Sequence, residues 1–248
     1  MNAEIDHLVW YQPIVAAASG RPSGAEALAR TFAADGRVVS AGALFSDPCF
    51  SHDRLERLDR QTVRRVGANI AEWAVIGFEP SVSINVSVST IARDPTGVLR
   101  WLAAERIDPA RITIEITETA PVGDIAVIAA AVERYRATGA RVAIDDFGCG
   151  SATFELLYRV GADLMKIDRR FVHSLTADER SRRVIAAMVR LAHELGMHVV
   201  AEGVETAAQW DWLTGVGCDF VQGYAIAHPM PADALVYWRD RVAWSAAS

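Results

Sequence analysis

The chain has 248 residues, of which 51% are hydrophobic and 23% are charged, so it is long enough to bury a large core and has the composition of a globular protein. Its net charge of −6 argues against binding to nucleic-acid polymers or anionic membranes, both of which require a basic surface. Three features of the sequence indicate a cytoplasmic protein. Its three cysteines are widely spaced, it has no apolar run as long as a membrane span, and it has no secretory signal pattern.

Short runs rich in Val and Ile alternate with helical patterns along the chain, which predicts parallel strands joined by helices. Eight such strands in a chain of this length favour one closed (β/α)₈ barrel of the TIM type over an open sheet. The predicted strands lie near 8–15, 23–28, 81–87, 112–117, 141–146, 164–168, 198–203 and 219–225.

The first two strands depart from this alternation. The segment AAASGRPSG at 16–24 is too short to hold a crossover helix, so we expect strands 8–15 and 23–28 to be antiparallel. Residues 31–52 predict loops around a small lobe, and the tail after Pro231 predicts a last helix. No linker separates a second unit, so we expect a single domain over 1–248.

Polar side chains collect near the C-terminal ends of seven of the eight predicted strands. Because side chains alternate across a strand, Asn85 shares the inward face with Ser83, whereas Ile84 points to the outer helices. The C-terminal strand ends of a barrel form one rim, where catalytic groups sit. We therefore expect the following side chains to converge: Glu26, Asn85, Glu115, Asp145, Asp146, Lys166, Glu202 and Gln222.

Five carboxylates on one rim cannot all be ionised without compensating positive charge. Lys166 supplies only one positive charge, so either several carboxyls stay protonated or cations neutralise them. Hard divalent cations prefer oxygen ligands, and two of them about 4 Å apart are the usual arrangement for phosphoester hydrolysis. A structural role is the alternative for each residue alone, since Asp145, Asp146 and Glu202 could cap the helices that follow them. Their shared location at one end of the strands favours a metal site.

Eight short motifs follow one another in an order and spacing that resemble a known family. They are YQPIV (11–15), GAEALAR (24–30), SINVS (83–87), EITE (115–118), DDFGCG (145–150), KIDR (166–169), AEGVET (201–206) and VQGY (221–224). Together they resemble the EAL-type cyclic di-GMP phosphodiesterases, and the resemblance covers roughly residues 8–235.

The resemblance implies a role for each matching residue. Four residues match ligands of a first metal ion: Glu26, Asn85, Glu115 and Asp145. Three more match groups around a second metal ion and its water: Asp146, Glu202 and Gln222. Lys166 matches the residue that orients the attacking water, Arg30 the arginine that grips a substrate phosphate, and Gln12 a residue of the substrate pocket. Glu118 and Glu205 match residues that support the site. In the family, the residue matching Glu118 anchors the loop corresponding to 146–152, which couples metal binding to dimerisation.

The implied activity is hydrolysis of cyclic di-GMP to linear pGpG by in-line attack of a metal-bound hydroxide, supported by Mg²⁺ or Mn²⁺. Glu26, Lys166 and Glu202 are the implied catalytic residues, and a homodimer is the implied assembly.

Some positions depart from the family pattern. The loop sequence is DDFGCGSAT where DDFGTGYSS is usual, Thr31 replaces a common tryptophan, and the FIPxAE pattern is missing. No metal-ligand position is lost, which favours an active enzyme. The altered loop keeps open a receptor that binds cyclic di-GMP without cleaving it. A barrel hydrolase for another phosphodiester is a third alternative, since fold alone does not fix the substrate.

Overall fold

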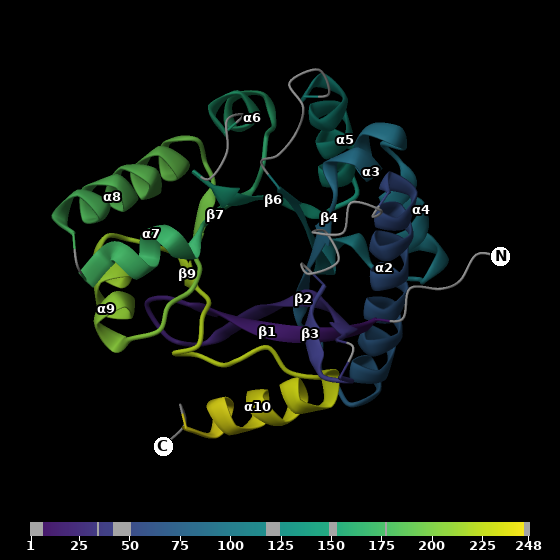
Figure 1. The fold of residues 1–248 in the computed structure, drawn as a ribbon, viewed down its shortest axis with the longest axis horizontal. Helices are drawn as coiled ribbons and strands as arrows, with labels where there is room; N and C mark the ends of the chain where they lie inside the picture. Colours follow the sequence, from purple (N-terminus) through teal and green to yellow (C-terminus); the bar gives the residue numbers. More distant parts are fainter. Residues whose placement is uncertain are drawn as a thin grey trace.

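The computed structural model describes residues 7–33, 35–41, 51–117, 125–148, 153–176 and 178–245. Eight strands form a closed ring in the order β1, β2, β4, β5, β6, β7, β8 and β9, with β9 returning to β1 (Figure 1). The predicted barrel is confirmed. The ring strands are β1 (Leu8–Ala16), β2 (Pro22–Phe32), β4 (Ser81–Val86), β5 (Ile112–Thr117), β6 (Arg141–Phe147), β7 (Leu164–Ile167), β8 (His198–Ala201) and β9 (Phe220–Val221).

Strand β1 runs antiparallel to both of its neighbours, β2 and β9, while the other pairs of the ring are parallel. This confirms the prediction made from the short segment between the first two strands. The β1–β2 register places Gln12 opposite Glu26, so both side chains reach the same part of the barrel.

Residues 31–52 were predicted to form loops, but the described part of this segment contains strand residues. Strand β2 continues to Phe32, and a short strand β3 (Val38–Ser40) pairs with this extension in an antiparallel hairpin. Gly36, with φ of +79°, lies in the turn, so the chain can reverse within a few residues. Residues 42–50 lie outside the described part of the chain. Strands β8 and β9 also end earlier than predicted, which leaves Glu202 and Gln222 one residue beyond their strands.

Helices surround the ring and cover its outer face (Figure 1). They are α2 (His52–Val75), α3 (Val88–Arg93), α4 (Gly97–Ala104), α5 (Ile125–Ala137), α6 (Thr153–Arg159), α7 (Arg169–His173), α8 (Glu179–Glu194), α9 (Ala207–Gly215) and α10 (Ala232–Ser245), with 3₁₀ turns at Pro109–Arg111 and Ser174–Thr176. Helix α10 confirms the predicted last helix. No helix in the described ranges combines the length and the apolar character needed to cross a bilayer.

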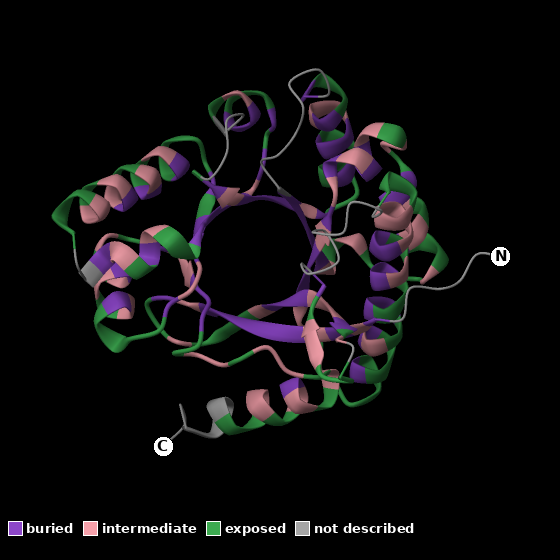
Figure 2. Ribbon diagram, viewed as in Figure 1, coloured by how far each residue is buried: buried purple, intermediate pink, exposed green. Residues whose placement is uncertain are grey.

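The main core lies between the ring and the helices, and Figure 2 shows the ring strands mostly buried and the outer helix faces mostly exposed. Val82, Ile84 and Val86 belong to this core, as strand alternation predicts. A second, smaller cluster of Ile14, Leu164 and Val200 with Ala143 fills the inside of the barrel. Inward side chains further along the strands are therefore held above a packed apolar layer rather than in an open pore.

Candidate active site

Lys166 lies at the centre of the acidic side chains that the barrel brings together. Its side chain is 1% exposed, and its Nζ atom contacts carboxylates from four different segments. The distances from Nζ are 2.6 Å to Glu115 Oε2, 2.7 Å to Glu202 Oε1, 3.0 Å to Asp145 Oδ1 and 3.5 Å to Glu26 Oε2. One buried ammonium group thus faces four carboxylates that are far apart in the sequence.

Amide side chains surround the carboxylate of Glu26 on β2. Asn85 at the end of β4 donates from Nδ2 to Glu26 Oε1 at 2.8 Å, and Gln222 donates from Nε2 to Glu26 Oε2 at 2.8 Å. Gln222 Nε2 also lies 3.2 Å from Gln12 Oε1. The burial of Glu26 opposes its ionisation, but the charge of Lys166 and these hydrogen bonds outweigh burial and lower its pKa.

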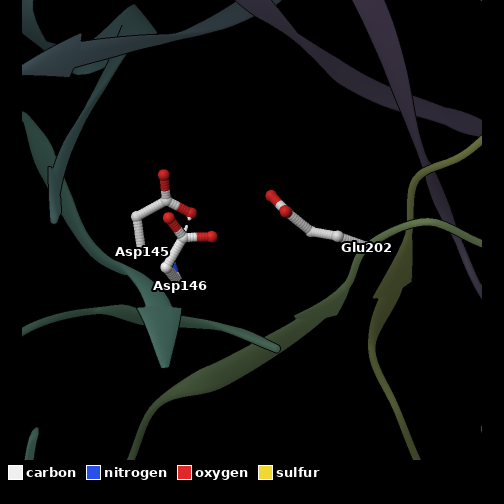
Figure 3. A group of neighbouring side chains, drawn as sticks. All are labelled: Asp145, Asp146 and Glu202. Atoms are coloured by element: carbon white, nitrogen blue, oxygen red, sulfur yellow. Dashed lines mark hydrogen bonds between the residues drawn. The ribbon is translucent and has the colours of Figure 1, made fainter. Parts of the chain in front are cut away.

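Asp145 and Asp146 point from the end of β6 towards Glu202, as Figure 3 shows. Ligand atoms of the three carboxylates lie within 4.8 Å of one another, which is close enough to share a cation. Asp146 has φ of +53°, a left-handed conformation that is uncommon outside glycine, and its backbone N–H donates to Asp145 Oδ1 at 3.0 Å. This local turn lets two consecutive residues both direct carboxylates to the same side.

The acidic groups carry more negative charge than Lys166 neutralises. The pKa values of several of these carboxyls are therefore raised. Burial and the neighbouring carboxylates raise the pKa of Glu202 to about 8 and that of Glu115 well above its usual value, although Lys166 opposes both shifts. Burial, Asp145 and a hydrogen bond with Asp168 raise the pKa of Asp146 to about 6. Burial alone would lower the pKa of Lys166, but the surrounding carboxylates raise it, so this residue stays charged.

The donor set fits divalent cations. Carboxylate and amide oxygens are the ligands that Mg²⁺ and Mn²⁺ prefer, and added positive charge would let the clustered carboxyls ionise together. The buried Oε1 atom of Gln222 has no hydrogen-bond partner among the described residues, so a polar or cationic partner would satisfy it.

A cleft of about 660 Å³ opens above these groups. Its lining includes Gln12, Glu26, Leu28, Ser40, Asp145, Asp146, Asp168, Arg169, Arg170, His173, Glu202, Gly203, Glu205, Gln222, Gly223 and Tyr224. The volume is in the range of pockets that hold drug-sized or somewhat larger ligands.

The remaining predicted site residues lie further from the cluster or outside the described residues. Arg30 is half-buried, with its guanidinium 5.7 Å from the Trp10 ring centre. Glu205 Oε1 lies 3.3 Å from His173 Nε2 at the edge of the cleft. Glu118 falls outside the described part of the chain, as do residues 149–152 of the altered loop. The cap of helix α9 is Thr206, with Gln209 completing a capping box, so the structural alternative for Glu202 does not apply.

Asp168 is a further residue of the site, which the sequence patterns did not predict. This buried residue caps α7 and lines the cleft beside Asp146. Its position directly after β7, two residues beyond Lys166, was an available signal.

The chain is similar to proteins that are named as cyclic di-GMP phosphodiesterases. The EAL domain family profile matches residues 4–229. Over 239 residues the chain is 30% identical to the probable cyclic di-GMP phosphodiesterase PdeB of Escherichia coli, covering 95% of this chain and 45% of PdeB. It is 32% identical over 232 residues to the cyclic di-GMP phosphodiesterase NbdA of Pseudomonas aeruginosa, covering 91% of this chain and 29% of NbdA. The chain therefore spans less than half the length of these relatives.

Solved structures with bound dinucleotide share the fold. The PaMucR phosphodiesterase in complex with c-di-GMP matches with a TM-score of 0.84 and 30% identity, over 92% of this chain and 94% of that one. A c-di-GMP-bound standalone EAL protein from Vibrio cholerae matches with a TM-score of 0.80 and 27% identity, over 93% and 95% of the two chains.

Proposed function

The chain belongs to the EAL domain family, and on that premise we propose that it hydrolyses cyclic di-GMP to linear pGpG with Mg²⁺ or Mn²⁺ as cofactor. The observation that carries the proposal is the set of buried carboxylates around Lys166 at the base of a cleft large enough for a dinucleotide. Relatives named as cyclic di-GMP phosphodiesterases support this choice of substrate.

Two groups of residues would hold the cations. Glu26, Asn85, Glu115 and Asp145 would hold one, and Asp146, Glu202 and Gln222 would stand around a second. Divalent cations bound there would supply positive charge that polarises the scissile phosphate and lowers the pKa of a water molecule.

The protein's own groups bind the substrate and stabilise charge. Arg30 would contact a non-bridging phosphate oxygen, for which a guanidinium is well suited, and Gln12 would line the pocket. Lys166 Nζ would donate a hydrogen bond to the attacking water and stabilise negative charge that develops on the phosphate. The water oxygen would form a bond to phosphorus in line with the P–O3′ bond, which breaks; one proton of the water ends on the 3′ oxygen, and the other stays on the new phosphate group or passes to solvent.

The test is turnover of cyclic di-GMP by the purified protein with Mg²⁺ or Mn²⁺, with the products separated by anion-exchange chromatography. We expect pGpG with metal present and intact substrate after chelation. Glu26→Ala should abolish turnover, because Glu26 connects Asn85, Gln222 and the proposed first cation. Turnover that survives this substitution would remove Glu26 from the site.

The receptor alternative makes a different prediction in the same assay. It rests on the altered sequence from Cys149 to Ala152 after β6 and predicts tight binding of the dinucleotide with no pGpG at saturating Mn²⁺. The full set of proposed metal ligands favours the enzyme. The homodimer and the cytoplasmic location stay predictions, which light scattering and cell fractionation can check.

A further inference from the structure

Asp59 is a buried acidic residue that lies outside the cleft. Its carboxylate binds the residues at the start of helix α3. It lies on α2, is 7% exposed, and accepts three hydrogen bonds at its Oδ2 atom. The donors are the backbone N–H of Ser87 at 3.1 Å, the hydroxyl of Ser87 at 2.9 Å and the hydroxyl of Thr90 at 2.7 Å. A single carboxylate oxygen therefore ties α2 to the junction between β4 and α3.

This junction directly follows Asn85. Strand β4 ends at Val86, and Ser87 is the N-cap of α3, so Asp59 contacts the backbone two residues beyond Asn85. Asn85 uses its amide nitrogen to bond Glu26, which leaves the amide oxygen as the atom able to bind a cation. The direction of that oxygen depends on where the strand ends and the helix begins.

Helix capping alone does not account for Asp59. The Ser87 hydroxyl already accepts from the Thr90 N–H at 3.3 Å, which is the ordinary cap of this helix. Burial of a carboxylate opposes ionisation, and an apolar side chain between α2 and β4 would avoid that cost. What the carboxylate adds is a fixed position of the cap relative to α2.

We infer that Asp59 is a positioning residue: by binding Ser87, it fixes the orientation of Asn85 for cation binding. This inference rests on the metal-binding role proposed for Asn85. Groups behind metal ligands orient them, and their loss weakens metal affinity by roughly 10- to 100-fold.

The test is Mn²⁺ binding without dinucleotide, measured by the loss of the free Mn²⁺ signal in electron paramagnetic resonance. We expect Asp59→Ala to raise the Mn²⁺ concentration for half-saturation by about 10-fold or more. Asp59→Asn should stay within about threefold of wild type, because an amide oxygen still accepts from Ser87. Wild-type Mn²⁺ binding by folded Asp59→Ala overturns the inference.

A matched control separates positioning from loss of stability. Val98 is fully buried on α4, so Val98→Ala should also lower the melting temperature, yet leave Mn²⁺ binding unchanged. An equal weakening in Val98→Ala would assign the effect of Asp59→Ala to stability. Should Asp59→Ala fail to fold, Ser87→Ala removes the hydroxyl that donates to Asp59 Oδ2, and unchanged Mn²⁺ binding in that variant also overturns the inference.

The binding measurement is independent of catalysis. A wild-type protein that binds Mn²⁺ but leaves cyclic di-GMP intact refutes the proposed hydrolysis, while the same titration still decides the role of Asp59. Among active variants, Asp59→Ala should need more metal for half-maximal activity and regain most of the turnover rate at saturating Mn²⁺.

Discussion

Lys166 Nζ lies 2.6 Å from Glu115 Oε2, and both side chains are 1% exposed. Removing one partner of such a pair leaves a buried charge without compensation, at a cost of about 3 to 5 kcal/mol. We expect Lys166→Met to lower the free energy of unfolding by that amount in metal-free buffer, as measured by urea denaturation.

The double variant Lys166→Met with Glu115→Gln is the control for this charge balance. Removal of both charges should recover part of the lost stability, because the neutral Glu115→Gln side chain leaves one carboxylate fewer beside Glu26, Asp145 and Glu202, which Lys166 no longer compensates. Additive losses in the two single variants would contradict a direct coupling between them. Mg²⁺ should raise the melting temperature of Lys166→Met more than that of wild type, since the cation replaces missing positive charge.

The raised pKa of the buried Asp59 carboxyl predicts that the free energy of unfolding depends on pH. Burial raises the pKa of its carboxyl from 3.8 to about 6, although hydrogen bonds from Thr90 and Ser87 oppose the shift. Between these values the folded state binds a proton that the unfolded state lacks, so stability from this group is present below pH 4 and is lost as the pH rises through 6.

Asp59→Asn does not titrate, so it isolates this contribution. From pH 4 to pH 7 the free energy of unfolding of wild type should fall relative to the variant by about 1 to 3 kcal/mol. Denaturant titrations of both proteins across this pH range measure the difference. A difference that stays constant with pH would contradict the raised pKa.

Strand alternation predicted the inward groups of the barrel, but not the arrangement around Lys166. Asn85, Glu115 and Asp145 follow from the period of two and from the rule that strand ends share one rim. The central place of Lys166 depends on the stagger of the strands, which the sequence does not state. Asp168 was missed because a residue just after a strand can serve equally as a helix cap, which it also does.

Contacts between distant elements account for the other differences. Asp59 lies on a helix and meets Ser87 only when α2 packs beside β4, so no local pattern marks it. Strand β3 has three residues and is defined by its pairing with the end of β2 rather than by its own composition. Strand β9 has only two residues, Phe220 and Val221, which is too short for a strand pattern to mark where it ends.

Gly223 packs directly against the backbone of the segment after β8, so there is no space for a side-chain atom at this position. A Cβ on this residue would overlap the backbone N and O atoms of Val204, in the segment that carries Glu202. Its φ of +157° is also rarely adopted by other residues. We expect Gly223→Ala to lower the free energy of unfolding by about 2 kcal/mol and turnover by at least about tenfold, because the displaced backbone moves Glu202.

Gly215 offers a matched control for that substitution. It ends helix α9, and a Cβ there would meet no atom within 4 Å. Gly215→Ala should be neutral or stabilise by up to about 1 kcal/mol, with unchanged turnover. Thermal melts and pGpG formation measured side by side test both variants, and equal effects at the two positions would contradict the close packing at Gly223.

The contact between Trp10 and Arg30 predicts that a change at Trp10 alters the affinity for substrate and not the rate of the chemical step. The Arg30 guanidinium lies over the Trp10 ring, 5.7 Å from its centre, which limits the directions that this arginine can take. A cation–π contact at a partly exposed site contributes about 0.5 to 1 kcal/mol, or roughly a two- to fivefold change in binding. Trp10→Leu should therefore raise KM for cyclic di-GMP by that factor and leave kcat within about twofold. Trp10→Tyr keeps an aromatic face and should stay near wild type, so an equal rise in KM for both variants would show that Trp10 acts through packing instead.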